Sequence, residues 1–360
     1  MAENGKGNGK SPATAQAAPN IQVNLVGLSK NDYRGAASTL CAGCGHNSIS
    51  NQIIAAAYEL NIVPEDVIKL SGIGCSSKSP AYFLNRSFGF NSLHGRMPSL
   101  ATGAMFGDHR LKAIAVSGDG DTTNIGMGQF KHIMRRNVPV VYIVENNGVY
   151  GLTKGQFSAT AELGLHLKYQ GTNQLTPVDI VQEAMASGAT FVARSFAGDA
   201  NQVKALIKAA LSHNGLAILD IISPCVTFNN GDDARHSYGW GREHEEPLHD
   251  FNFVPREQEI RLGDFPEGTT RMVTLHDGSQ IVLKKLERDY DPTQRAAAMR
   301  LIEETHNEAV LITGLIYVDP QRPSLTQTYQ LPKDRPLNRM TEKELRPAKS
   351  MIEKANAMMF

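Results

Sequence analysis

Between about residues 40 and 230, short apolar runs alternate with longer amphipathic stretches. The runs are rich in Val and Ile and mostly continuous, which indicates strands buried on both faces of a sheet. The stretches between them place apolar residues at helical spacing. Strands are predicted over Val67–Gly72, Lys112–Ser117, Val138–Val144, Thr190–Ser195 and Leu216–Ile222, and helices over Asn47–Leu60, Ile125–Arg136, Asp179–Ala186 and Asn201–Leu211. This alternation predicts an α/β fold, a parallel sheet with helices on both faces.

The pattern changes at both ends of the chain. Residues 1–22 are mostly Gly, Asn, Ala, Ser and Pro, which predicts a disordered arm. After residue 230, a polar stretch leads to two apolar runs around Asp277-Gly278, the signal for a β-hairpin. A helix over Pro292–Glu308 and a Pro-rich tail follow. We therefore expect an arm (1–22), one α/β domain (23–230) and a C-terminal extension (231–360).

Composition excludes several classes of function. The chain of 360 residues has 36 Lys and Arg against 36 Asp and Glu, so no net positive charge attracts nucleic acid. No run approaches the roughly 18 apolar residues of a membrane helix, and the polar arm lacks the apolar centre of a signal peptide. We expect a cytoplasmic protein that binds neither nucleic acid nor membranes.

Polar residues follow two successive predicted strands, where ligands collect in parallel sheets. The first strand leads into Gly118–Asp121 (GDGD) and the second into Asn146–Tyr150 (NNGVY). Glycines let the backbone approach a ligand, and the following helix points its amino terminus at the same place. Oxygens of Asp119 and Asn147, with the carbonyl of Val149, suit Mg²⁺ that holds a diphosphate. If either cluster occurred alone, it would be interpreted as a turn.

Four cysteines form a second pattern. Cys41 and Cys44 are a C-x2-C pair, whereas Cys75 and Cys225 each follow a predicted strand. Zinc sites more often show a second close pair, and a redox C-x2-C would not need the two distant cysteines. One pair and two single cysteines suit a 4Fe-4S cluster. The alternative is that Cys75 and Cys225 are small buried apolar residues.

Together these segments resemble the beta subunits of 2-oxoacid:ferredoxin oxidoreductases. The resemblance covers roughly residues 38–230, and the long extension is similar to a subgroup that often acts on 2-oxoglutarate. The matching motifs, in the order of the family, are CAGCGH (Cys41–His46), SGIGCSSK (Ser71–Lys78), LHGR (Leu93–Arg96), GDGD (Gly118–Asp121), RRN (Arg135–Asn137), NGVYGLTKGQ (Asn147–Gln156) and SPCVTF (Ser223–Phe228).

The resemblance implies a reaction and its partners. The family oxidatively and reversibly decarboxylates a 2-oxoacid, here expected to be 2-oxoglutarate, to its acyl-CoA and CO2. Electrons leave singly to ferredoxin. The implied cofactors are thiamine diphosphate, Mg²⁺ and one 4Fe-4S cluster, so residues 23–230 would be the thiamine diphosphate and iron–sulfur binding domain. No second, pyrimidine-binding domain is recognisable, which implies a heterodimer with an alpha subunit and no activity without it.

The resemblance also assigns residues. It implies Mg²⁺ ligation by Asp119, Asn147 and Val149, and cluster ligation by the four cysteines. Two lysines are candidates for binding substrate carboxylates or CoA, although a lone lysine is more often a surface charge. These are Lys78 and Lys154. The implied thiamine diphosphate contacts are Ile73, Gly74, Ser76, His94, Gly120, Asp121, Asn147, Gly151 and Leu152.

Other functions remain open at this point. Pyruvate or another 2-oxoacid is an alternative substrate. A thiamine-dependent decarboxylase or synthase without redox function is an alternative enzyme, and an iron–sulfur carrier without catalysis is a third possibility. His94, outside its motif, would be read as a core histidine bonded to backbone.

Overall fold

The computed structural model describes residues 22–231, 234–255, 270–275, 278–284, 286, 290–306 and 310–359. The predicted disordered arm lies outside the described residues, apart from Gln22.

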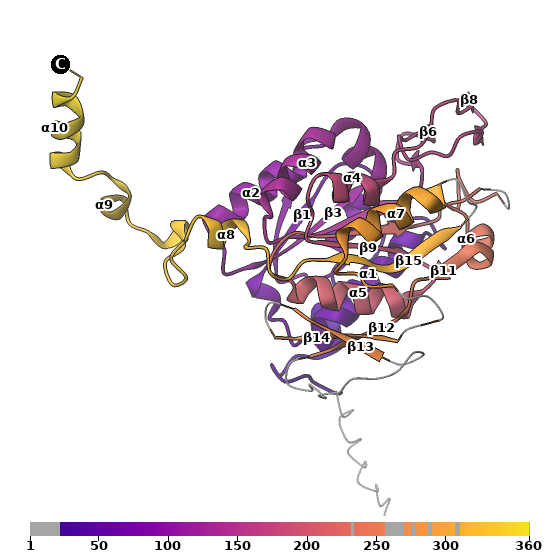
Figure 1. Ribbon diagram of the computed structural model, residues 1–360, viewed down its shortest axis with the longest axis horizontal. Helices are drawn as coiled ribbons and strands as arrows, with labels where there is room; N and C mark the ends of the chain where they lie inside the picture. Colours follow the sequence, from indigo (N-terminus) through magenta and orange to yellow (C-terminus); the bar gives the residue numbers. More distant parts are fainter. Residues whose placement is uncertain are drawn as a thin grey trace, which may run out of the picture.

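A mixed, mostly parallel sheet forms the centre of the molecule (Figure 1). Its strand order is β11-β15-β9-β10-β4-β3-β1-β2, and the run from β9 to β2 is parallel throughout. Only β15 is antiparallel to its neighbour β9. The strands are β1 (Val67–Ser71), β2 (Phe88–Asn91), β3 (Lys112–Gly118), β4 (Val141–Asn146), β9 (Phe191–Phe196), β10 (Ala217–Ile222), β11 (Glu245–Pro247) and β15 (Leu311–Val318).

Helices cover both faces of this sheet, as Figure 1 shows. One face packs against α1 (Gly45–Glu59) and α5 (Ala200–Ser212). The other packs against α2 (Met97–Gly107), α3 (Met127–Arg136), α4 (Ile180–Ala186) and α7 (Arg295–His306). In α3 the buried side chains are Phe130, Ile133 and Met134, the helical spacing that the sequence shows. The predicted fold class is confirmed.

The predicted elements between residues 40 and 230 lie close to the observed ones. The predicted helix over Ile125–Arg136 begins two residues later, because a π-helical turn over Asp121–Ile125 (η4) precedes it. Among the elements that were not expected are β2, α2 and β15. Strand β2 is exposed at the sheet edge, and α2 has no charged residue to mark a polar face. Strand β15 falls in the segment predicted from the sequence to be a Pro-rich tail, and its eight residues are all buried.

The region after residue 230 adds elements to the body. A three-stranded antiparallel sheet of β12 (Asp250–Val254), β14 (Gln280–Lys284) and β13 (Thr270–Thr274) packs against α5. Strands β13 and β14 are the predicted hairpin. Gly278 of its turn has φ 82°, whereas Asp277 lies outside the described residues. Because β11 and β15 join the main sheet, part of the extension completes the same fold; the division at residue 230 stays a prediction.

Smaller elements lie on loops. These are η1 (Lys30–Tyr33), η2 (Pro64–Asp66), η3 (Ser76–Ala81), α6 (Tyr238–His244), and the short pairs β5 (Val149–Tyr150) with β6 (Gln156–Phe157) and β7 (His166–Leu167) with β8 (Gly171–Thr172). None of the helices in the described ranges is long and apolar enough to cross a membrane.

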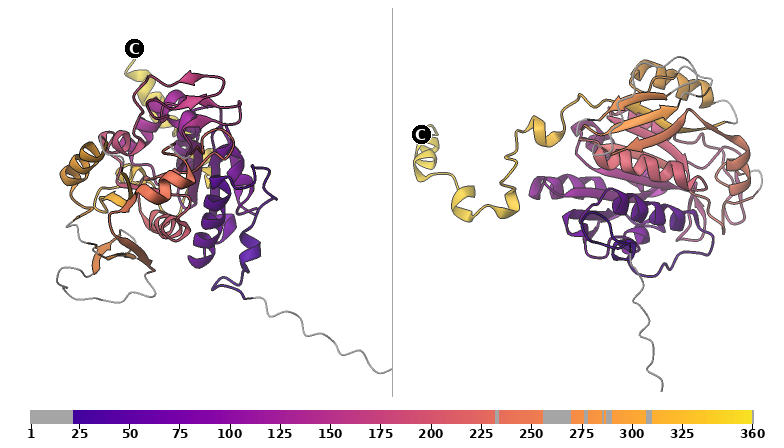
Figure 2. Two further views of the ribbon diagram at one scale, coloured as in Figure 1. Left: turned by 90° about the vertical axis from the view of Figure 1, so that its right-hand side faces the viewer. Right: turned by 90° about the horizontal axis from the view of Figure 1, so that it is seen from below.

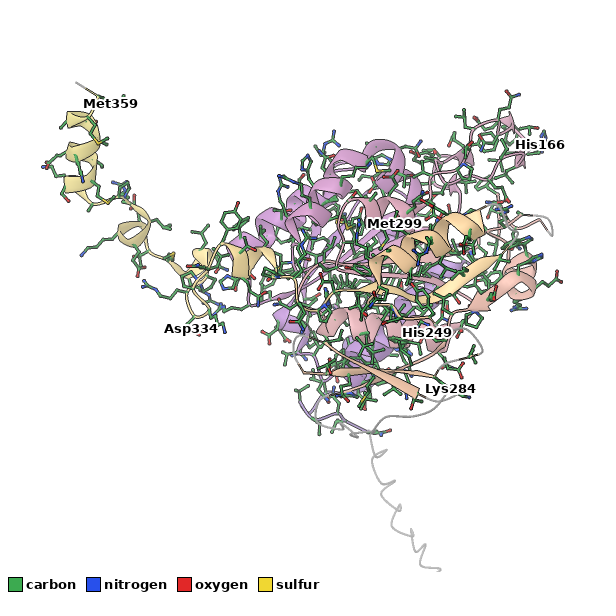
Figure 3. All side chains as sticks on the ribbon, viewed as in Figure 1. His166, His249, Lys284, Met299, Asp334 and Met359 are labelled. Atoms are coloured by element: carbon green, nitrogen blue, oxygen red, sulfur yellow. The ribbon has the colours of Figure 1, made fainter. Side chains whose placement is uncertain are left out.

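The chain ends in an arm, defined here as residues 330–359, that leads away from the body (Figure 2). It follows α8 (Leu325–Thr328) and contains η6 (Leu337–Arg339), α9 (Glu342–Leu345) and α10 (Lys349–Ala357). The first part of the arm contacts the body through η6 and α2. Figure 3 shows the end of the arm, at Met359, standing clear of the sheet and its helices. Every residue from 341 to 359 is exposed.

Candidate active site

A cavity lies at the carboxyl ends of β1, β3 and β4. Its lining comes from five segments: the first turn of α1, the turn after β1, the loop before α2, the turn after β3, and the loop from the end of β4 into the β5–β6 pair. All of the predicted thiamine diphosphate contacts line it. The full lining is His46, Ile73, Gly74, Cys75, Ser76, His94, Gly118, Asp119, Gly120, Asp121, Glu145, Asn147, Val149, Tyr150, Gly151, Leu152 and Thr153.

Asp119 lies at the base of this cavity, almost completely buried. Its Oδ1 accepts a hydrogen bond from the Asn147 amide at 3.3 Å. Its Oδ2 accepts one from Thr160 Oγ1 at 2.9 Å and another from the Ser158 hydroxyl. Burial raises the pKa of the Asp119 carboxyl above its usual value, because the charged form loses its hydration.

Asn147 meets Asp119 from the end of the neighbouring strand. Its Oδ1 accepts a hydrogen bond from the Val149 amide at 3.1 Å, and its backbone carbonyl accepts one from Asn229 Nδ2 at 2.9 Å. The side chains of Asp119 and Asn147 and the backbone of Val149 therefore gather in one buried place. Carboxylate, amide and carbonyl oxygens are the hard donors that Mg²⁺ prefers, so this donor set fits that ion.

Asp121 organises the loop that carries His94. Its Oδ1 accepts a hydrogen bond from the Gly95 amide at 2.7 Å and contacts His94 Nδ1. Its Oδ2 accepts one from Ser117 Oγ at 2.5 Å. These bonds fix the LHGR segment against the turn after β3, so His94 stands at the cavity wall as a partner of a carboxylate.

Close backbone approaches shape the cavity where the motif has glycine. A Cβ added at Gly120 would collide with the ring of Tyr150, whose hydroxyl donates to the Gly120 carbonyl at 3.0 Å. A Cβ at Gly151 would stand 3.5 Å from Cys75 Sγ and 3.7 Å from Cys225 Sγ. Two of the predicted cluster cysteines therefore converge at one wall of the cofactor cavity.

The other two cysteines lie on a tight turn before α1. The Cys44 amide donates to the Cys41 carbonyl at 3.2 Å, and the Gly45 amide donates to the Pro224 carbonyl at 3.4 Å. The second bond joins this turn to the segment that carries Cys225. All four cysteines are free thiols.

Electrostatics also couple the cysteines. Burial raises the pKa of the Cys44 thiol to about 12, and Glu145, Cys225 and Cys75 add to the rise. Burial raises the pKa of the Cys75 thiol, and Cys225 adds to that rise. The Cys44 and Cys75 thiols would therefore release a proton on binding a metal, as thiolate ligands must.

Within the described residues, no group of three or more His, Cys, Asp or Glu is close enough to hold a single metal ion. A 4Fe-4S cubane takes one cysteine per iron, so its ligands stand farther apart than those of one ion. Four free thiols from three segments that meet beside Gly151 and Pro224 fit such a cluster in their chemistry. Its presence stays a prediction.

The two predicted lysines do not line the cavity. Lys78 is half-buried in η3, where its amide donates to the Cys75 carbonyl at 3.1 Å and its charge offsets part of the rise in the Cys75 thiol pKa. Lys154 is exposed on the β5–β6 loop with φ 78°. Their roles in binding substrate or CoA stay predictions.

Glu145 and His46 line the cavity but were not singled out from the sequence. Both Glu145 oxygens accept from Ser79 Oγ at 2.9 Å, and His46 Nδ1 lies 3.6 Å from Glu145 Oε2. Burial raises the pKa of Glu145 well above its usual range and lowers that of His46 to about 4. The His46 ring is therefore neutral near pH 7, and burial favours the protonated form of Glu145 beside the cavity. A carboxyl at the end of the apolar run VVYIVE was the available signal.

Comparison with known families gives two matches. Residues 72–221 match the family described as thiamine pyrophosphate enzyme, C-terminal TPP binding domain. Residues 282–334 match the family that describes the C-terminal part of the pyruvate ferredoxin oxidoreductase beta subunit. The second match falls in the predicted extension and includes β15.

Curated relatives resemble the chain over about half of its length. A 2-oxoacid:ferredoxin oxidoreductase subunit beta of Saccharolobus solfataricus is 42% identical over 191 residues, 53% of this chain and 63% of that protein. The 2-oxoglutarate oxidoreductase subunit KorB of Mycobacterium tuberculosis is 40% identical over 53% of this chain and 51% of its own length. The 2-oxoglutarate synthase subunit KorB of Methanocaldococcus jannaschii is 36% identical, with 52% and 69% covered. The chain thus spans less than two thirds of the first of these relatives.

A solved structure matches nearly the whole chain. It is the 2-oxoglutarate:ferredoxin oxidoreductase from Magnetococcus marinus with 2-oxoglutarate, coenzyme A and succinyl-CoA bound. The TM-score is 0.69 at 30% sequence identity, over 96% of this chain and 99% of the matched one.

Proposed function

Since this chain belongs to the family of 2-oxoacid:ferredoxin oxidoreductase beta subunits, we propose that it forms one half of an enzyme that oxidatively decarboxylates a 2-oxoacid. The products are the acyl-CoA and CO2, with single electrons passed to ferredoxin, and the reaction is reversible. One observation carries this proposal: a single cavity joins the GDGD turn, the Asn147 loop and the LHGR loop, and its wall contains Cys75.

The chain's own residues would hold the cofactors in that cavity. Asp119, Asn147 and the Val149 carbonyl would bind Mg²⁺, and the remaining lining residues named above would enclose thiamine diphosphate. Thiamine diphosphate supplies the carbanion and electron sink for release of CO2, and a 4Fe-4S cluster accepts electrons singly. Cys41, Cys44, Cys75 and Cys225 would hold the cluster beside the cavity.

The assigned partner is an alpha subunit that carries the pyrimidine-binding domain. Three large apolar side chains near the cavity are solvent-exposed in this chain, namely Ile73, Leu93 and Leu152. Clustered apolar exposure of this kind marks a surface that another protein covers. An alpha subunit seated there would close the cavity and complete the heterodimer.

We propose 2-oxoglutarate as the substrate. Two relatives and the matched structure carry 2-oxoglutarate in their names, which supports this choice. Its distal carboxylate needs a cation, and Lys78 and Lys154 remain the candidates of this chain for substrate or CoA. The cytoplasmic location expected from the sequence stays a prediction.

The test is anaerobic purification of the chain with its co-expressed partner, followed by iron and sulfide analysis and EPR spectroscopy. We expect about four irons per chain and a reduced-cluster signal on addition of 2-oxoglutarate with CoA. A signal with pyruvate alone would keep the reaction and change the substrate. Zinc or no metal, without reduction by either acid, would contradict the redox function.

A thiamine-dependent decarboxylase or synthase without a cluster is the second candidate. The cavity lined by Asp119, Asn147 and Val149 would serve such an enzyme equally, with no role for the cysteines. The variant Cys75→Ser separates the two functions. Retained turnover with altered stability would support the non-redox enzyme, whereas loss of electron transfer supports the oxidoreductase.

A further inference from the structure

The segment Ser223–Asn229, which follows β10, contacts both the cysteine turn and the metal loop. At its start, the Ser223 amide donates to the Asn146 carbonyl at 2.7 Å, and Ser223 Oγ lies 2.6 Å from His46 Nδ1. The Pro224 carbonyl accepts from the Gly45 amide. The first half of the segment is therefore bonded to the turn that carries Cys44 and to the end of β4.

The second half of the segment is a tight turn that closes on itself. The Asn229 amide donates to the Cys225 carbonyl at 3.0 Å, and the two residues form a β-bridge. Asn229 is almost fully buried, and its Nδ2 donates to the Asn147 carbonyl. One short turn thus links a predicted cluster ligand to the backbone of a predicted Mg²⁺ ligand.

Two further contacts hold this turn against the loop after β4. A Cβ added at Gly155 would stand 2.8 Å from the Phe228 ring, and one at Gly148 would stand 2.9 Å from Asn229 Nδ2. Both glycines have positive φ, 91° and 73°, which side chains rarely adopt. The two loops are therefore packed backbone against side chain, and neither shifts without the other.

We propose that Asn229 is a positioning residue that couples occupation of the cysteines to binding of Mg²⁺ and thiamine diphosphate, an inference that rests on the proposed function. A cluster held by Cys225 orders the turn from Cys225 to Asn229. The side-chain amide of Asn229 then holds the Asn147 carbonyl, and with it the loop that contains Asn147 and Val149. Because binding linkage is reciprocal, the diphosphate cofactor also favours retention of the cluster.

The experiment measures this coupling in the anaerobically purified complex with its partner subunit. Calorimetric titration with thiamine diphosphate in Mg²⁺ gives the dissociation constant before and after removal of iron with a chelator. In the unaltered protein, we expect cluster removal to weaken binding by about fivefold or more, the usual size of a coupling between sites. In Asn229→Ala, this ratio falls to near one.

The matched control is Asn173→Ala. Asn173 is similarly buried, and its Nδ2 donates to the Ala161 and Glu162 carbonyls at 2.9 and 3.0 Å, on a loop without predicted ligands. This variant keeps the ratio of the unaltered protein. If Asn229→Ala fails to fold, Phe228→Leu is the substitute variant. It keeps Asn229 but loosens the contact of the ring with Gly155, so the ratio of the two dissociation constants should fall.

A second readout follows the reciprocal effect. Thiamine diphosphate slows release of iron to a chelator in the unaltered complex and in Asn173→Ala, and not in Asn229→Ala. An equal ratio in the unaltered protein and Asn229→Ala, or a ratio of one in the unaltered protein, overturns the coupling while the proposed function stands. A complex that binds neither iron nor thiamine diphosphate overturns both.

Discussion

Two buried carboxyls of this chain differ in what compensates their charge. Asp119 receives hydrogen bonds from hydroxyls and one amide, and burial raises its pKa. Asp108 is equally buried, at the other edge of the sheet. Its Oδ1 accepts a hydrogen bond from Arg110 Nε at 2.9 Å, and its Oδ2 accepts one from Arg110 Nη2 at 2.8 Å. The hydrogen bonds from Arg110 lower the pKa of Asp108. A buried charge without a cation costs free energy, which is typical of a position kept for a ligand.

Asp119→Asn should therefore separate stability from cofactor binding. Without metal, the amide removes the cost of a buried charge, so the melting temperature is unchanged or higher. Binding of thiamine diphosphate in Mg²⁺ weakens by at least about tenfold to a hundredfold. Thermal unfolding and calorimetry measure the two effects.

Asp108→Asn is the control for this variant. It loses its pairing with Arg110 and lowers the free energy of unfolding by about 1 kcal/mol, since Arg110 is partly exposed and solvent screens the pair. Cofactor binding is unaffected. A large fall in the melting temperature of metal-free Asp119→Asn would show that its carboxylate stabilises the fold.

His249 makes stability depend on pH. It is almost fully buried, neither ring nitrogen has a hydrogen-bond partner among the described residues, and burial lowers its pKa to about 4. The unfolded state, with a histidine pKa near 6.5, binds the proton first, so stability is complete above about pH 6.5 and falls as the pH drops toward 4. At a pH below about 4, His249 lowers the free energy of unfolding by about 3 kcal/mol relative to its value above about pH 6.5.

His249→Leu should flatten the curve of melting temperature against pH between about 6.5 and 4. The exposed His166 of β7, labelled with His249 in Figure 3, is the control position, and His166→Leu leaves the curve unchanged. His46 and His236 have pKa values lowered to about 4 by burial, so part of the slope remains. An unaltered slope in His249→Leu would refute the contribution of His249.

Strand β15 is the element that joins the extension to the body. It lies between β9 and β11, and Leu315 and Val318 are buried in the core shared with α1 and α5. Gly314 has φ 116°, and a Cβ there would stand 3.1 Å from the His249 ring. The core of residues 23–230 is thus closed by a strand from outside that range.

A fragment that ends at residue 230 should fail to fold cooperatively. Without β15, strand β9 becomes an open edge and the apolar faces of Phe191 and Ala193 meet water, so aggregation follows. Circular dichroism during heating and light scattering measure this. A sharp unfolding transition of the monomeric fragment would instead establish residues 23–230 as an independent domain.

Across the whole molecule, the candidate active site and the C-terminal arm lie at opposite ends of the sheet. The cavity is lined by residues that follow the carboxyl ends of the strands. In Figure 1, α8 leads the arm away on the side opposite to β6. The segment that precedes the arm is anchored by the Tyr329 ring against Phe106 and by the Leu325 amide, which donates to the Asn137 carbonyl. Beyond residue 340, every described side chain is exposed.

Removal of residues 341–360 should change the free energy of unfolding by less than about 1 kcal/mol, because changes at exposed positions are nearly neutral. The melting temperature should therefore stay nearly the same. A second truncation after residue 310, which also removes β15, prevents folding. Thermal unfolding compares the two. A marked loss of stability in the shorter truncation would show that the arm packs on the body.

The sequence by itself determined the strands β1, β3, β4, β9 and β10 and the motif residues at their ends. It could do so because continuous Val and Ile runs and helical spacing are local properties of the chain. The same local turn signals located Asp119 and Asn147, and the family resemblance then assigned most of the cavity lining. The cofactors and residue roles remain predictions.

The tertiary structure alone decided which distant residues meet. Strand β2 follows from its pairing with β1, and β15 from its antiparallel pairing with β9. The roles of Glu145, His46 and Asn229 could not be read from the sequence, although His46 ends the CAGCGH motif, because their bonding partners come from distant segments of the chain. Parallel pairing brings segments that are far apart in the chain to one edge of the sheet. Contacts between such segments cannot be predicted from local sequence patterns.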